Sequence, residues 1–239
     1  MPVMGPTDSY KYLGILVSAT GKGKSYGHVL EEGLSHLRRA PLKPQQRLAI
    51  LVNHLIPTIM HRLVVGSVYR TQLSRMDRVI RVAVRGFLKL PGDTPDAMLY
   101  AAVGDGGLGV PNLHVAVALS KQGRLERLLV STDPAVRAAA GDIAVSKEIR
   151  YWSSPPLLRG VQVRSGTEAK ARWSVVLKSH VDDRGMVPQA TQPCNLSKWV
   201  MGTSSLLSGR DYVDALAARC ATLPTPLRRS RGRPEVDGR

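Results

Sequence analysis

Aromatic residues are scarce in this sequence: they make up 5% of its 239 residues, and Phe87 is the single phenylalanine. Large β-sandwich and β-barrel cores favour aromatic and β-branched side chains, so this scarcity argues against an all-β protein. Ala, Leu, Val and Arg are abundant instead, which favours helices. We therefore expect a mainly α fold, organised as one large domain or two small ones.

Cysteine is rarer still. Cys194 and Cys220 have no metal-ligand spacing and provide no disulfide framework, which is typical of an intracellular protein. No uninterrupted apolar run reaches the length of about 18 residues that a membrane span needs. The N-terminal segment also lacks the basic and apolar regions of a signal peptide. We expect an intracellular protein that contacts no membrane.

Acidic residues are strongly outnumbered. The chain has 18 Asp and Glu against 34 Lys and Arg, which gives a net charge of +16. An isoelectric point near 10.4 is typical of proteins that bind nucleic acid, and the guanidinium fork of Arg suits phosphate well. A coding bias that enriches Arg and Ala is the alternative explanation. The low aromatic content argues against a platform that stacks the bases of single strands.

Hydrophobic spacing predicts a short β element followed by a series of helices. Residues 10–18 are β-rich and precede the turn-like Gly21-Lys22-Gly23-Lys24, so a strand or hairpin is expected there. A helix is predicted over 28–39, and another over 44–66, in which Pro57 should cause a kink or break near Leu55. Further helices are predicted over 71–90, 112–130, 134–145, 167–181 and 209–221, and irregular segments over 151–166 and 182–195.

The predicted helix over 71–90 has two chemically distinct faces. Its apolar face consists of Leu73, Met76, Ile80, Ala83 and Phe87. Its opposite face carries Arg78, Arg81, Arg85 and Lys89. We expect the apolar face to pack on the 44–66 helix. The four cations should form a continuous solvent-facing ridge, free of internal carboxylates, that contacts backbone phosphates.

Two further basic segments are candidate nucleic-acid contacts. Lys22 and Lys24 lie in the predicted N-terminal turn. The C-terminal tail, which we expect to be mobile, contributes Arg228, Arg229, Arg231 and Arg233.

Several short patterns resemble catalytic motifs but lack the rest of the site. Gly23-Lys24-Ser25 is not a phosphate-binding loop of the Walker type, because the Gly required five positions before Gly23 is Ser18. The G-x-G-x-x-G pattern over 104–109 is not set in a βαβ unit, so we interpret it as a loop that needs positive φ or close packing. Asp182-Asp183 lacks the third carboxylate of a two-metal site.

The histidines do not suggest a metal site either. His54 and His61 lie about two turns apart on one predicted helix, which is too far for shared coordination of one ion. His114 and His180 have no nearby partners in the sequence. We therefore predict no metal site and no catalytic residue in this chain.

Three segments, together with residues near the C-terminus, resemble one family. Tyr12-Leu13-Gly14-Ile15 resembles the strand that closes the palm of non-LTR retrotransposon reverse transcriptases. Residues 42–47, with Leu55-Ile56-Pro57, resemble the start of their thumb. The run from Asp77 to Pro111, which contains Phe87-Leu88-Lys89-Leu90-Pro91 and a Gly-rich loop, is similar to the R2 clade. Residues 209–212, 223–225 and 231–233 resemble the segment before that clade's zinc knuckle.

This resemblance implies a domain plan: the end of the palm over 1–40, the thumb over 41–110, and a helical linker with a basic tail over 111–239. It implies contact with an RNA–DNA or RNA duplex and with the remainder of the polyprotein, in the nucleus. The polymerase's Mg²⁺-binding aspartates are expected upstream of Tyr10, and the zinc knuckle and endonuclease after Arg239. The segment itself should then need no cofactor and be inactive. An alternative is a free-standing basic helical adaptor that binds acidic partners.

Overall fold

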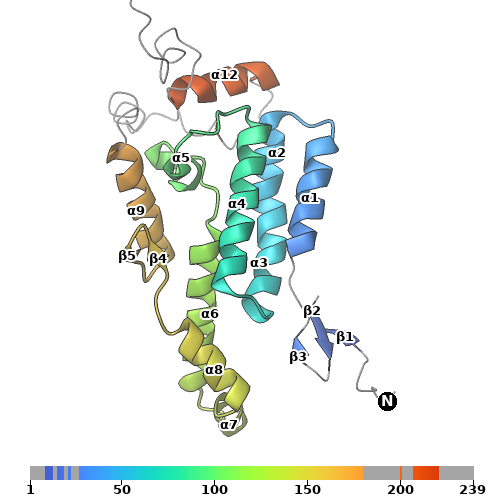
Figure 1. Cartoon of the computed structure of the whole chain (residues 1–239), viewed down its shortest axis with the longest axis vertical. Coiled ribbons are helices and arrows are strands. Elements are labelled where there is room, and N and C mark those ends of the chain that lie inside the picture. Colours follow the sequence, from blue (N-terminus) through green and yellow to red (C-terminus); the bar gives the residue numbers. More distant parts are fainter. Residues whose placement is uncertain are drawn as a thin grey trace, which may run out of the picture.

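The computed structural model describes residues 9–12, 15–18, 21–22, 27–179, 200 and 207–220. These residues form a mainly helical fold with two small antiparallel sheets, as the composition predicts (Figure 1). The α-helices are α1 (Gly27–Arg39), α2 (Pro44–Ile50), α3 (Ile56–Val65), α4 (Arg70–Phe87), α5 (Asp96–Tyr100), α6 (Leu113–Leu129), α7 (Pro134–Ala140), α8 (Ile143–Trp152), α9 (Gly166–Ser179) and α12 (Gly209–Arg219).

The N-terminal β element is a three-stranded antiparallel sheet. β1 (Ser9–Tyr12) pairs with β2 (Ile15–Ser18), and β2 pairs with β3 (Gly21–Lys22). The prediction of a strand or hairpin is confirmed. Lys22 lies in β3 and pairs with Val17, rather than in the turn where we expected it.

The predicted 44–66 helix is one rod that contains a wide turn. α2 continues into the π-helix η1 (Leu51–Leu55) and then into α3, and the amide of Ile56 donates to the carbonyl of Leu51. Pro57 has no amide hydrogen and its ring clashes with the carbonyl four residues earlier in a regular helix. A π-turn just before the proline absorbs this conflict, so the predicted irregularity near Leu55 is present without a break.

This rod carries the central apolar stripe of the fold. Leu48, Leu51, Ile56, Ile59 and Leu63 are all buried. By length and composition, the 22-residue helix from Pro44 to Val65 would suffice to cross a membrane, although polar and charged residues such as Arg47, Asn53 and Arg62 interrupt its apolar sequence. A third of its most apolar 18-residue window is buried inside the bundle, and the stripe belongs to this buried part.

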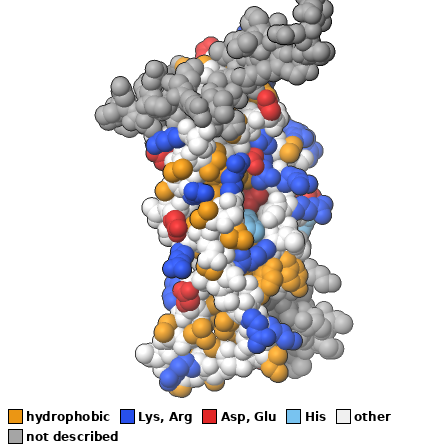
Figure 2. Space-filling model, turned by 60° about the vertical axis from the view of Figure 1, so that its left-hand side comes forward, with side chains coloured by type: hydrophobic (Ala, Val, Ile, Leu, Met, Phe, Trp, Pro, Cys, Tyr) orange, Lys and Arg blue, Asp and Glu red, His pale blue; other side chains and the backbone are white. Residues whose placement is uncertain are grey.

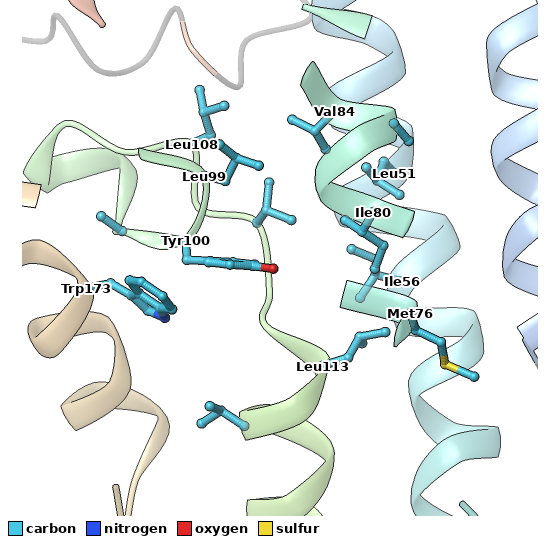
Figure 3. Close-up of a cluster of buried hydrophobic side chains, with 14 of the residues drawn as sticks. Leu51, Ile56, Met76, Ile80, Val84, Leu99, Tyr100, Leu108, Leu113 and Trp173 are labelled. Atoms are coloured by element: carbon cyan, nitrogen blue, oxygen red, sulfur yellow. The ribbon is translucent and has the colours of Figure 1, made fainter. Parts of the chain in front are cut away.

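α4 is the central helix of the bundle and packs against α1, α2 and α6. The predicted apolar face is confirmed, since Leu73, Met76, Ile80, Ala83 and Phe87 are each 5% exposed or less. Figure 3 shows Met76 and Ile80 of this face beside Leu51 and Ile56 of the rod, with Leu113 of α6 and Tyr100 of α5 on the other side. Burial of large aliphatic side chains, roughly 1.5–3 kcal/mol each, is the main force that holds these helices together.

The Gly-rich segment after α5 is a tight loop, as interpreted from the sequence. It contains the 3-10 turn η2 (Val103–Asp105), and Gly106 and Gly109 have positive φ. At Gly107, a Cβ atom would come within 2.2 Å of the carbonyl oxygen of Ala101. The glycines are thus needed for backbone geometry and close packing.

The helices predicted over 112–130, 167–181 and 209–221 are present as α6, α9 and α12. The single helix predicted over 134–145 was wrong: α7 ends at Ala140 and α8 begins at Ile143, because the Asp142 carboxylate caps α8 by accepting from the amides of Ala144 and Val145. The irregular segment predicted over 151–166 contains the hairpin of β4 (Leu157–Leu158) and β5 (Val161–Gln162). The loop predicted over 182–195 and Asp182-Asp183 lie outside the described residues.

Candidate nucleic-acid interface

The predicted basic ridge on α4 is not continuous. Arg78 and Lys89 are exposed, but Arg81 and Arg85 are only partly exposed and both contact one carboxylate. The Asp96 Oδ1 atom lies 2.7 Å from Nη2 of Arg85 and 3.3 Å from Nε of Arg81. Our expectation of four solvent-facing cations free of internal carboxylates was therefore wrong for Arg81 and Arg85.

The cause is the chain that follows α4. It turns back and places α5 beside the same flank of the helix. Arg85 also donates to the carbonyl of Thr94 (2.7 Å), and Arg81 donates to the Tyr100 hydroxyl (3.1 Å). Burial raises the pKa of Tyr100, so this hydroxyl keeps its proton over the whole ordinary pH range. The two guanidinium groups therefore hold the 94–100 segment against α4.

Lys89 is exposed, but it belongs to a helix end. Its φ of 51° lies in the left-handed region, and the amide of Leu90 donates to the carbonyl of Arg85 at 2.9 Å. This is the hydrogen-bond pattern of a Schellman motif, in which the left-handed residue follows the last helical turn. The lysine charge thus lies beyond α4, close to the negative end of the helix dipole.

The exposed cations of α4 lie instead along its border with α1. A surface groove with a cavity of about 310 Å³ runs between the two packed helices, and Arg38 of α1 and Arg78 of α4 both line it. Leu34, Val79, Val82 and Ala83 provide its apolar part, and Glu31 also lines it. A second cavity of about 240 Å³, lined by Arg75 and Glu31 among others, lies between the same helices.

Within the described part of the chain, Arg38, Arg75 and Arg78 form no ion pair with a carboxylate. Arg39 is exposed as well and donates to the Ser35 hydroxyl at 2.9 Å. We call the set Arg38, Arg39, Arg75 and Arg78 the α1–α4 basic edge. It presents guanidinium groups to solvent from two packed helices.

Sequence reasoning had missed Arg38, Arg39 and Arg75. Arg75 is separated from Arg78 by one helical turn, so the helical pattern of α4 contained the signal for it. Arg38 and Arg39 end a different helix, and only the packing of α1 on α4 brings Arg38 into the same groove as Arg78.

The remaining predicted site residues are not brought into this edge. Lys22 belongs to β3 of the N-terminal sheet. Lys24, Arg228, Arg229, Arg231 and Arg233 lie outside the described residues. Figure 2 shows that Lys and Arg side chains are also dispersed over the face turned forward there, separated by apolar and uncharged groups.

The other buried ionisable groups near α4 have structural partners. Asp77 is 2% exposed, and its two carboxylate oxygens accept from the amides of Leu113 and His114 at 2.8 Å each, so it caps α6. Burial raises the pKa of Asp77 to about 6, although both amides oppose the shift. Burial likewise lowers the pKa of His114, whose Nδ1 lies 3.2 Å from the Ser74 hydroxyl.

No metal-binding constellation occurs in the described part of the chain, because no three His, Cys, Asp or Glu residues there lie close enough to hold an ion. His54 and His61 are exposed. The donor groups described here therefore do not fit the Mg²⁺ site of a polymerase.

The chain matches no protein-family model, but it is similar to curated polyproteins. It is 32% identical over 238 residues to the retrovirus-related Pol polyprotein of the type-2 retrotransposable element R2DM of Drosophila melanogaster, which is 99% of this chain and 22% of the relative. It is 30% identical over 231 residues to the R2 Pol polyprotein of Nasonia vitripennis, which covers 96% of this chain and 21% of that relative. An R2 Pol polyprotein of Popillia japonica is 34% identical over 196 residues, which covers 82% of this chain and 42% of that relative.

These alignments agree with the resemblance carried by the palm-like, thumb-like and Gly-rich segments. The chain spans between about a fifth and less than half of the length of these relatives. It therefore belongs to the Pol polyproteins of R2 retrotransposable elements and corresponds to one segment of them.

Proposed function

We propose that this segment contacts the phosphate backbone of a nucleic-acid duplex as part of an R2-type RNA-directed DNA polymerase. The α1–α4 basic edge carries this proposal, because its guanidinium groups face solvent and those of Arg38, Arg75 and Arg78 have no carboxylate partner among the described residues. Arg binds phosphate oxygens through paired N–H groups, and such contacts position a duplex without reading its sequence.

In this proposal residues 1–40 end the palm, residues 41–110 form the thumb, and residues 111–239 form a linker with a basic tail. The basic edge, which joins Arg38 and Arg39 at the end of the palm to Arg75 and Arg78 of the thumb, would then lie along the template–primer duplex. Lys22, Lys24, Lys89 and the tail arginines Arg228, Arg229, Arg231 and Arg233 would add contacts around it. Polymerase activity and its Mg²⁺ would belong to the longer protein, because the described residues here offer no carboxylate cluster. The longer protein would act in the nucleus.

The test is a gel-shift titration of the 239-residue chain with an RNA–DNA duplex at several salt concentrations. The double variant Arg75→Ala/Arg78→Ala should bind more weakly, with a flatter dependence of log K on log salt. The slope should fall by roughly 1 for each phosphate that the variant no longer neutralises. Both side chains are exposed, so the fold should be retained, which circular dichroism would verify.

The matched control is Arg127→Ala/Arg137→Ala. It removes the same charge from exposed positions on α6 and α7. An equal loss of affinity in both double variants, or no loss in Arg75→Ala/Arg78→Ala, would contradict a duplex site at the basic edge. Binding to heparin as tight as to the duplex would favour the adaptor that binds acidic partners.

A further inference from the structure

A pocket outside the basic edge opens between the turn that joins α3 to α4 and one face of α8. Its cavity of about 490 Å³ lies within the range of small-molecule sites. The residues that line it come from these two segments: Ser67, Val68 and Tyr69 from the turn, and Ala144, Val145, Lys147, Glu148, Tyr151 and Trp152 from α8. α8 lies near the lower end of the molecule in Figure 1.

Two aromatic rings of this pocket are exposed, in a chain where aromatic residues are rare. Tyr69 is 63% exposed and Tyr151 is 42% exposed. Their ring centroids lie 6.1 Å apart and the ring planes meet at 87°. An exposed tyrosine ring next to a cavity provides a flat apolar surface with a polar end, which suits stacking of another planar group.

The rings are held in position by the surrounding residues. The Tyr151 hydroxyl accepts a hydrogen bond from the amide of Arg70 at 3.0 Å. The guanidinium of Arg70 lies 5.1 Å from the ring centroid of Trp152, which in turn lies 5.0 Å from that of Tyr151. A preorganised wall of this kind lowers the entropic cost of binding a ligand.

The charge around the pocket favours an anionic ligand. Lys147 is exposed and lines the pocket, and Arg150 is exposed one turn further along α8. Glu148, the acidic residue in this lining, has its carboxylate 2.9 Å from the ammonium of the buried Lys121. The local balance is therefore positive, next to apolar rings.

We propose that this pocket stacks an unpaired base of single-stranded nucleic acid on Tyr69, while Lys147 contacts the adjoining phosphate. A planar base joined to a phosphate matches both halves of the site, whereas an apolar peptide side chain matches only the rings. The low aromatic content argued against a base-stacking platform, but folding gathers Tyr69, Tyr151 and Trp152 at one place. The proposed contact is separate from the backbone contacts of the α1–α4 basic edge.

The test compares two single-stranded probes of equal length and charge: oligoadenylate RNA and the same backbone with abasic positions. Fluorescence anisotropy with the 239-residue chain should give roughly tenfold tighter binding for the probe that carries bases. Tyr69→Ala should abolish this difference, and Tyr69→Phe should retain it because the ring remains. Oligodeoxyadenylate, measured in parallel, identifies which sugar the site prefers.

Two further variants make the outcome decisive. Lys147→Ala should weaken both probes equally, because it removes a phosphate contact and leaves the rings. Arg75→Ala/Arg78→Ala should leave the difference in affinity between the two probes unchanged. A failure of the base-stacking proposal can therefore be distinguished from a failure of the proposed duplex site. Equal affinity of the two probes for the native chain overturns the proposal. So does a Tyr69→Ala variant that folds normally and still prefers the probe with bases.

Discussion

Arg78 and Arg85 lie two turns apart on the same helix, yet their surroundings differ completely. Arg85 contacts Asp96 and the carbonyl of Thr94, and its side chain is 16% exposed. Arg78 faces solvent beside α1, with no carboxylate partner among the described residues. A charge pattern along a helix shows which way a side chain leaves the axis, but a neighbouring segment decides whether it reaches solvent.

This contrast predicts opposite effects of alanine on stability. Arg85→Ala should lower the free energy of unfolding by roughly 1.5–3 kcal/mol, because it removes hydrogen bonds to a charged group and to a backbone carbonyl. Arg78→Ala should change it by no more than about 0.5 kcal/mol. Urea unfolding followed by circular dichroism measures both.

A double-mutant cycle with Asp96→Ala separates the ion pair from the other effects of each substitution. The two single effects should be non-additive, since the groups touch. Strict additivity, or an Arg78→Ala variant as unstable as Arg85→Ala, would show that the pairing is not what holds α5.

Asp77 predicts a pH dependence of stability. Its pKa is raised from 3.8 to about 6 in the folded chain, so between these values the folded state binds the proton more tightly than the unfolded state. Its contribution is therefore fully present below about pH 4 and is lost as the pH rises through about 6, by at most about 3 kcal/mol.

Asp77→Asn provides the matched variant, because its amide does not titrate. The free energy of unfolding of the native chain, minus that of this variant, should be lower at pH 7 than at pH 4 in urea unfolding. A constant difference at the two pH values would mean that Asp77 keeps an ordinary pKa in the fold.

At the scale of elements, the sequence predicted regular helices well and short elements poorly. The spacing of Leu30, Leu34 and Leu37 was enough to predict α1, because one apolar face produces a clear period. Helix α5 was not predicted, since its five residues are too few to show that period. The capping role of Asp142 was visible only once α8 was seen to begin there.

The candidate site was predictable to a similar degree. The apolar face of α4 and its outward Arg78 followed from the helical period alone. The pairing of Arg81 and Arg85 with Asp96, and the approach of Arg38 to Arg78, depend on how the chain folds back. Such long-range contacts leave no periodic signal in a single sequence.

The Gly-rich loop predicts a sharp difference between two neighbouring glycines. Gly107→Ala should destabilise the fold by several kcal/mol, because its Cβ would clash with the backbone of Ala101 at 2.2 Å. Gly104→Ala should be tolerated, since nothing lies within 4 Å of a Cβ there. Thermal unfolding of the two variants compares them directly, and equal melting temperatures would refute the close approach.

At the scale of the whole molecule, one buried cation connects the far end of the bundle to its centre. Lys121 of α6 is 1% exposed, donates to the carbonyl of Gly66 at 2.8 Å and pairs with Glu148 of α8. Its ammonium also lies 5.5 Å from the ring centroid of Trp152. The base-binding pocket proposed at α8 is thus anchored to the middle of the same helix whose N-terminus Asp77 caps.

The π-turn in the long rod has a consequence for how the chain tolerates changes of length. A π-turn accommodates one residue more than a regular turn, so it is equivalent to a single insertion already absorbed into the helix. Leu48 before it and Ile59 after it nevertheless both reach the core. Removing one residue between them would convert the π-turn into a regular turn and keep both positions facing the core, whereas a further insertion would rotate everything that follows by about 100°. Related sequences can therefore lack one residue between these two positions where they also lack the π-turn.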